Sequence, residues 1–242
     1  MSTPRVSELM DNAVVIAKPK DIISKVISDM RDFKAFVVPV INENGKLVGV
    51  LSYRDLLERR VSLRSKVSSV MSPPYSISQD SDLVKAMSKI VNLRVRALPV
   101  VDSSMNLVGM LTREKVLNYL LSNKLLPRTQ VSSIMSKPAI TIEADEAVAR
   151  AKWLMVRHGI TRLPVLESGR LYGIVSMRDI IERLYYASIP RRSRRGEVVG
   201  TEDDILAAPV KAIATTPVIT VNEDDDVYAA VELMLGKGVS GM

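Results

Sequence analysis

The chain lacks cysteine altogether and contains a single histidine, and both features narrow the chemistry that is open to it. Without thiolates it can form neither a disulfide framework nor a cysteine-ligated metal site. The sequence also lacks a Gly-x-x-x-x-Gly-Lys-Ser/Thr phosphate loop and a histidine-based catalytic pair. We therefore expect a protein that is not an enzyme and that carries no resident cofactor or metal ion.

Aromatic residues are few, at 4% of the chain, and apolar runs are short. The longest candidate run, residues 35–41, is interrupted by Pro39 and is much shorter than the roughly 18 apolar residues of a membrane span. Met1 leads almost directly into the first repeat, which leaves no room for a signal peptide. These features predict a cytoplasmic protein without membrane contact.

The sequence contains one pattern that is repeated four times, and the fourth copy is incomplete. The opening segment of each copy, Val-x-x-hydrophobic-Met with Ala replacing Met in the last, begins at Val6, Val67, Val131 and Val210. In the first three copies an amphipathic helix, a strand ending in Pro-Val and a second strand follow. That second strand opens with glycine, at Gly49, Gly109 and Gly173. A period near sixty with this internal order predicts repeated βαββα units.

The third copy shows the expected unit most clearly. Its strand, helix, two antiparallel strands and second helix are predicted at residues 138–142, 145–158, 160–166, 171–175 and 178–184. Asp145 is the expected N-cap of the first helix, with Asp21 and Asp80 in the same position in copies one and two. Asp224–Asp226 would cap the corresponding helix of the fourth copy. Trp153 and the methionines lie at helical spacing, which is typical of core residues.

One unit cannot bury both faces of its small sheet, so we expect pseudo-two-fold pairs packed sheet against sheet in an α+β fold. The first pair is predicted at residues 6–125, with repeats at 6–60 and 67–121. The second is predicted at 130–242, with a repeat at 131–185, a basic linker at 186–209 and a partial repeat at 210–242. The fourth copy stops before its Pro-Val strand; we interpret this as truncation of a longer chain, the alternative being a gap covered by another subunit.

The ordered motifs resemble the cystathionine-β-synthase (CBS) domain, and tandem pairs of such domains form Bateman modules. The resemblance covers nearly the whole chain apart from its linkers. It implies a regulatory protein that binds AMP, ADP or ATP in clefts between paired repeats and acts on an unidentified effector protein. S-adenosylmethionine is less expected, because basic pockets favour phosphates. The resemblance also implies a flat homodimer.

Two Ser-x-x-Asp motifs are the leading candidate sites: Ser52 with Asp55, and Ser176 with Asp179. Such a motif at a strand-to-helix junction can be a capping box that needs no ligand. Alternatively, the helix N-terminus can hold a phosphate, while the carboxylate accepts hydrogen bonds from ribose hydroxyls. The resemblance favours the second interpretation, since the family uses this aspartate to bind ribose.

Residues around the Pro-Val strands complete the expected nucleotide sites. Those with backbone expected to line an adenine pocket, or with side chains expected to reach phosphates, are Val37, Pro39, Arg54, Ile160, Thr161, Arg162, Pro164 and Arg178. The second repeat has Lys115 where the aspartate should be, and lysine cannot accept a hydrogen bond. We therefore expect its half-site to be weak, empty or limited to phosphate, with Arg94 and Arg96 keeping it positive.

The net charge of +7 leaves a second function open, because it favours anionic partners of any kind. The densest basic cluster is Arg191–Arg195, in a segment that ends with Gly196 and Gly200. It can be a solvated linker or an arm that contacts nucleic acid. The two functions are compatible if nucleotide binding controls nucleic-acid binding.

Overall fold

The structure is a computed structural model that describes residues 3–59, 62–188 and 201–242. The basic cluster Arg191–Arg195 therefore lies outside the described residues. Within them the fold is mixed α+β, which confirms the predicted class. The described residues form a two-stranded sheet and two three-stranded sheets. No helix among them is long and apolar enough to cross a membrane.

The repeats share one order of elements, and their bounds are as follows. The first repeat supplies α1 (Ile23–Asp32), β1 (Val37–Ile41), β2 (Leu47–Ser52) and α2 (Tyr53–Glu58). The second supplies β3 (Ile77–Ser78), α3 (Leu83–Leu93), β4 (Ala97–Val101), β5 (Leu107–Thr112) and α4 (Arg113–Ser122). The third supplies β6 (Ile142–Glu143), α5 (Val148–His158), β7 (Arg162–Glu167), β8 (Arg170–Ser176) and α6 (Met177–Ser188). After these come α7 (Glu202–Ala207) and α8 (Val227–Lys237).

Each opening segment docks on the neighbouring repeat rather than on its own. The backbone N–H of Val6 donates to Ser81 of the second repeat at 2.8 Å, and that of Val67 donates to Asp21 of the first at 2.8 Å. The segments at Val131 and Val210 dock on the fourth and third repeats in the same way. Repeats one and two therefore exchange their opening segments, and repeats three and four do the same.

This exchange explains the glycine that opens the second strand of each unit. A Cβ atom at Gly49 would lie 2.7 Å from the sulfur of Met71, and one at Gly109 would lie 2.9 Å from that of Met10. Met71 and Met10, which end the opening segments of repeats two and one, therefore pack directly against the glycine of the partner repeat. The two motifs belong to one contact, although they lie in different repeats, 22 residues apart for Gly49 and Met71 and 99 residues apart for Met10 and Gly109.

The exchange also corrects the predicted helix starts. The expectation that Asp21, Asp80 and Asp145 begin the first helices is wrong by one or two residues. In the third repeat, Ala147 forms a bridge with Pro209 of the docked segment, so the backbone stays extended until Val148. The predicted strand at 138–142 is likewise confined to Ile142–Glu143. In the fourth repeat Asp226 caps α8 through the N–H of Tyr228, as predicted.

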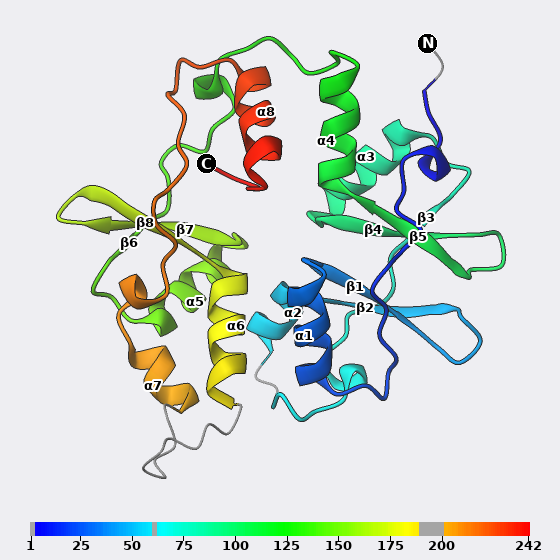
Figure 1. Ribbon diagram of the computed structural model, residues 1–242, viewed down its shortest axis with the longest axis horizontal. Helices are drawn as coiled ribbons and strands as arrows, with labels where there is room; N and C mark the ends of the chain where they lie inside the picture. Colours follow the sequence, from blue (N-terminus) through cyan, green and yellow to red (C-terminus); the bar gives the residue numbers. More distant parts are fainter. Residues whose placement is uncertain (1–2, 60–61, 189–200) are drawn as a thin grey trace.

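Contacts between helices join the first repeat to the third and the second repeat to the fourth (Figure 1). A single core cluster joins α1 and α2 of the first repeat to α5 and α6 of the third. The α4 and α8 helices lie side by side, and the Tyr228 hydroxyl donates to Leu121 at 3.2 Å. Val37, Val50, Ala97 and Met110 pack the sheets of repeats one and two face to face. These contacts form within one chain, and the homodimer stays a prediction.

Trp153 is not a core residue, contrary to the sequence prediction. Its side chain is 50% exposed on the outer face of α5, and the Arg150 guanidinium stacks 4.4 Å from the centre of its ring. The inner stripe of the helix is taken instead by Val148, Ala151 and Met155. Helical spacing identified the apolar residues of α5 but not which of them face inward.

Candidate functional site

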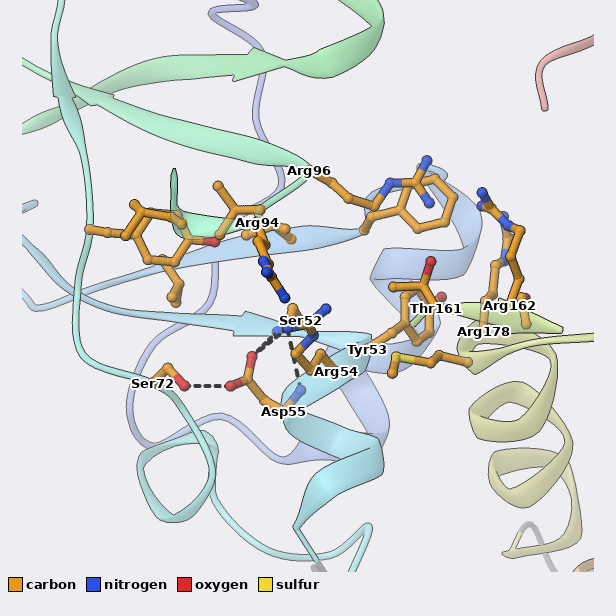
Figure 2. Close-up of a pocket in the computed structure, with 18 residues that line it drawn as sticks. Ser52, Tyr53, Arg54, Asp55, Ser72, Arg94, Arg96, Thr161, Arg162 and Arg178 are labelled. Carbon is orange, nitrogen blue, oxygen red and sulfur yellow. Dashed lines mark hydrogen bonds between the residues drawn. The ribbon is translucent and has the colours of Figure 1, made fainter. Parts of the chain in front are cut away.

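A cavity of about 200 Å³ lies where the first three repeats meet (Figure 2). Strands β1 and β2 and helix α2 form one wall, and residues 93–96, which connect α3 to β4, form another. The third repeat closes the cavity through β7 and the start of α6. The site is thus built from segments more than one hundred residues apart in the sequence.

Part of the cavity lining is apolar. Val37 and Val50 are almost fully buried, and Leu93 and the ring of Tyr75 complete this part. Burial raises the pKa of the Tyr75 hydroxyl well above its usual value, with the Asp55 carboxylate acting in the same direction. The tyrosine is therefore neutral at physiological pH and presents a flat, uncharged surface. Such a surface suits an aromatic ring.

Asp55 also lines the cavity, and its exposed fraction is 9%. It closes a capping box with Ser52: the Ser52 N–H donates to Asp55 Oδ2 at 2.8 Å, and the Ser52 hydroxyl donates to the same oxygen. The hydroxyl of Ser72, on the docked segment of the second repeat, donates to Oδ1 (Figure 2). The capping box that the sequence allows is therefore present. A ligand hydroxyl would have to compete with Ser72 for Oδ1.

Arginine side chains from all three repeats also line the cavity, and they are Arg54, Arg94, Arg96, Arg162 and Arg178. Acidic partners balance only part of this charge. Arg96 pairs with Glu114 at 3.0 Å and Arg178 with Glu182 at 2.7 Å, whereas Arg54 donates to the carbonyl oxygen of Gly159. In Figure 2, Arg162 and Arg178 approach from the third repeat, on the side facing Arg96.

Arg94 occupies a backbone position that would suit glycine better. It ends α3 with φ of 52°, the left-handed conformation that Gly159 and Gly238 adopt at the ends of α5 and α8. Such a conformation costs a non-glycine residue roughly 1–2 kcal/mol. Its side chain extends toward Ser52 inside the cavity (Figure 2). Strain at a position that supplies a cation to a cavity is typical of a binding site.

The arginines also repel one another. Burial lowers the pKa of Arg162 to about 10, and the charges of Arg96 and Arg113 push it in the same direction. Burial likewise lowers the pKa of Arg113, with a further contribution from Arg96. A neighbouring cavity of about 540 Å³ shares Arg54, Arg94, Arg96 and Arg162 with the first and adds Arg113. A bound anion would relieve this repulsion.

The second Ser-x-x-Asp motif makes the same cap but leaves its carboxylate more available. The Ser176 N–H and hydroxyl both donate to Asp179 Oδ2 at 2.7 Å. Among the described residues, none donates a hydrogen bond to Asp179 Oδ1. Burial raises the pKa of this carboxyl. Ser176 lines the central cavity, whereas Asp179 lies behind it.

The structure gathers most of the predicted site residues at this cavity, namely Val37, Ser52, Arg54, Asp55, Thr161, Arg162, Ser176 and Arg178. Ile160 lines the neighbouring cavity, while Pro39 and Pro164 lie within the hairpins, opposite Val50 and Ile174. Arg94 and Arg96, which were assigned to the half-site of the second repeat, both line this cavity, and Arg96 also lines the cavity that contains Lys115.

Ser72, Tyr75 and Phe36 line the cavity but were not among the predicted residues. The first two follow the opening segment of the second repeat, so the docking of that segment places them over the first repeat. Phe36 lies near two cations: the Arg96 guanidinium is 3.6 Å from its ring centre, and that of Arg178 is 5.8 Å away. A repeat alignment that allows for exchange could have located Ser72 and Tyr75.

Comparison with known proteins assigns the repeats. The CBS domain model matches residues 6–62, 67–122, 131–186 and 210–242. The chain belongs to the CBS domain family. It is 27% identical over 240 residues to protein MJ1404 of Methanocaldococcus jannaschii, covering 98% of this chain and 56% of that protein. The chain therefore spans little more than half the length of that relative.

A second relative shares both sequence and fold. Protein MJ1225 of the same organism, proposed to be an archaeal homologue of γ-AMPK, is 24% identical over 259 residues, covering 98% of this chain and 91% of that protein. Its crystal structure matches with a TM-score of 0.85 at 22% identity. A conserved protein from Pyrococcus horikoshii matches 98% of the chain, and 88% of that protein, with a TM-score of 0.62 at 19% identity. The four-repeat CBS fold is thus shared.

Proposed function

We propose that this chain is a regulatory module that binds an adenine nucleotide in the central cavity of the first three repeats. The observation that carries the proposal is the combination of groups that line one cavity. They are apolar side chains, a buried carboxylate and a cluster of guanidinium groups, which suit the base, the ribose and the phosphate of a nucleotide. Each part of the ligand thereby meets groups of suitable chemistry.

The expected pose follows from these contacts. The base lies against Val37, Val50 and Tyr75, and the ribose hydroxyls donate to Asp55 in competition with Ser72. The phosphate then reaches arginines of more than one repeat, where charge-assisted hydrogen bonds are about twice as strong as neutral ones. A sulfonium group would meet the same positive charge, so S-adenosylmethionine is disfavoured over AMP, ADP and ATP.

Binding would also link repeats that are distant in sequence. Arg54 of the first repeat already donates to Gly159 of the third, and Arg96 and Arg178, from the second and third repeats, both lie near Phe36 of the first. A phosphate that recruits these guanidinium groups would change the contacts between repeats. A difference in ligand affinity between two arrangements is all that regulation of an effector requires. A second nucleotide position is proposed at Asp179, whose Oδ1 can accept from a ribose hydroxyl.

The test is calorimetric titration of AMP, ADP, ATP and S-adenosylmethionine into the parent chain and into Asp55→Asn. Loss of the carboxylate charge should weaken nucleotide binding at the first site by about tenfold or more, since hydrogen bonds to charged groups contribute roughly 1.5–3 kcal/mol.

Asp204→Asn is the matched control. Thr201 and Asp204 form a capping box of the same geometry on α7, with the Thr201 N–H 2.7 Å from Asp204 Oδ2, and neither residue lines the central cavity. Its nucleotide affinity should equal that of the parent. Equal affinity in the parent and Asp55→Asn would contradict the proposal and leave Ser52 and Asp55 as a helix cap.

A further inference from the structure

The first pair of repeats contains a second cleft that can be compared with the first, position by position. Ser72 and Asp11 each lie five residues after the valine that begins an opening segment. Each forms an antiparallel bridge with the same position of a partner strand, Val50 for Ser72 and Met110 for Asp11. Asp55 and Lys115 are likewise equivalent, because each is the third residue after the N-cap of its helix.

The apolar part of the second cleft is retained. Val14, Ala97 and Met110 occupy the positions of Tyr75, Val37 and Val50, and all three line a cavity of about 990 Å³. Phe33, at the position of Leu93, lines the same cavity and is 71% exposed. Both clefts therefore offer space and apolar surface. A difference in nucleotide binding between them cannot come from these two properties.

The charges, in contrast, are inverted. Where Ser72 donates to Asp55 in the first cleft, Lys115 forms an ion pair with Asp11 at 2.7 Å in the second. The two side chains are 45% and 44% exposed, so both reach the space that a ligand would enter. The carboxylate has moved from the helix to the docked segment, and a cation now stands where ribose hydroxyls would need an acceptor.

The next position is inverted as well. Glu114 is equivalent to Arg54, lines the 990 Å³ cavity and pairs with Arg96 at 3.0 Å. In the first cleft this position presents a cation to the expected phosphate. In the second it presents a carboxylate, which repels a phosphate and also occupies a neighbouring arginine.

We propose that Lys115, Asp11 and Glu114 are specificity-determining residues that exclude phosphorylated nucleosides from the second cleft. The first pair of repeats then binds one nucleotide, in the cleft of Asp55. This inference rests on the proposed function and adds to it the number and location of the working sites.

Exchange of the three residues between the clefts tests it. The variant Asp11→Ser/Glu114→Arg/Lys115→Asp gives the second cleft the charges of the first. The variant also carries Asp179→Asn, so that the third repeat does not add to the number of ATP molecules bound. ATP titration should give one equivalent bound before the exchange and two after it. The control Asp11→Glu/Lys115→Arg keeps the ion pair and should still bind one.

The reverse exchange, Arg54→Glu/Asp55→Lys/Ser72→Asp, gives the first cleft the charges of the second. It should reduce ATP affinity by at least tenfold while a Lys–Asp pair replaces the Ser72–Asp55 hydrogen bond. Circular dichroism and thermal unfolding establish that each variant is folded.

The outcomes separate the two proposals. Two equivalents bound by the Asp179→Asn background would overturn the inference while supporting the proposed function. The inference is also overturned if the first exchange gains no site in a folded protein, or if the reverse exchange leaves binding intact. Absence of any binding in the parent refutes the proposed function itself, and the inference with it.

Discussion

The two Ser-x-x-Asp motifs have the same sequence pattern and the same helix cap, yet their carboxylates are not equally available. In the first pair of repeats, the docked segment brings the Ser72 hydroxyl to the free oxygen of Asp55. In the second, Thr215 takes the equivalent position, but Asp179 Oδ1 accepts no hydrogen bond from the described residues. The motif determines the cap, and the neighbouring repeat determines what remains for a ligand.

The docked segments also approach their partner strands to different degrees. A Cβ atom at Gly109 would lie 2.7 Å from the carbonyl oxygen of Asp11, whereas the nearest atoms to a Cβ atom at Gly173, among them the carbonyl oxygen of Thr215, would be 3.1 Å away. The backbone of the docked segment is therefore closer to Gly109 in the first pair than to Gly173 in the second.

The largest expected effect concerns this difference in packing. Gly109→Ala should lower the free energy of unfolding by about 2–3 kcal/mol, because the new methyl group overlaps the backbone carbonyl oxygen of Asp11, which cannot move aside as a flexible side chain can. Gly173→Ala should cost only about 1 kcal/mol. Gly236→Ala is the control: Gly236 lies on α8 with no neighbour within 4 Å of a new Cβ, and alanine should stabilise the helix by about 0.5–1 kcal/mol. Urea unfolding measures all three, and equal costs at Gly109 and Gly173 would contradict the comparison.

An intermediate effect is expected at Ser72. Ser72→Ala removes the hydroxyl that competes with a ribose for Asp55, and should increase AMP affinity by about three- to tenfold while costing roughly 1 kcal/mol of stability. Thr215→Val changes the equivalent residue, whose side chain donates no hydrogen bond to Asp179, and should leave affinity unchanged. Calorimetry with AMP measures both. Weaker binding by Ser72→Ala would show that Ser72 supports the ligand instead of competing with it.

The smallest effect concerns the pKa of Asp179, which burial raises. A carboxyl with a raised pKa binds protons more readily in the folded state, so its contribution to stability falls as pH rises through the acidic range. Asp179→Asn removes this penalty and should increase Tm at pH 7 by on the order of 1–3 °C. The gain should disappear as pH falls below the ordinary range of an aspartic acid. A gain that does not vary with pH would contradict the assigned cause.

Much of the fold could be predicted from the sequence, because its elements are defined within single repeats. The Pro-Val strands, the glycines and the Ser-x-x-Asp caps all follow from local patterns, and the structure confirms them as elements. The helix starts were wrong because a segment from another repeat holds the preceding residue extended. No pattern inside one repeat carries that information.

The candidate site was predictable only in part for the same reason. Spacing identified Asp55 and Arg54, which belong to one helix. It could not show that Arg94 and Arg96 face the first repeat, or that Arg162 and Arg178 approach them from the third. The convergence of these cations depends on how the pairs of repeats pack, which is a property of buried surfaces distant in sequence.

The central claim is that the cavity recognises a nucleotide along its whole length, with the arginines holding the phosphate. Titration of AMP and of adenosine into the parent chain, under identical conditions, tests it most directly. AMP should bind at least tenfold more tightly than adenosine, and added salt should reduce this difference because it screens charge interactions. Equal affinities for AMP and adenosine would contradict it.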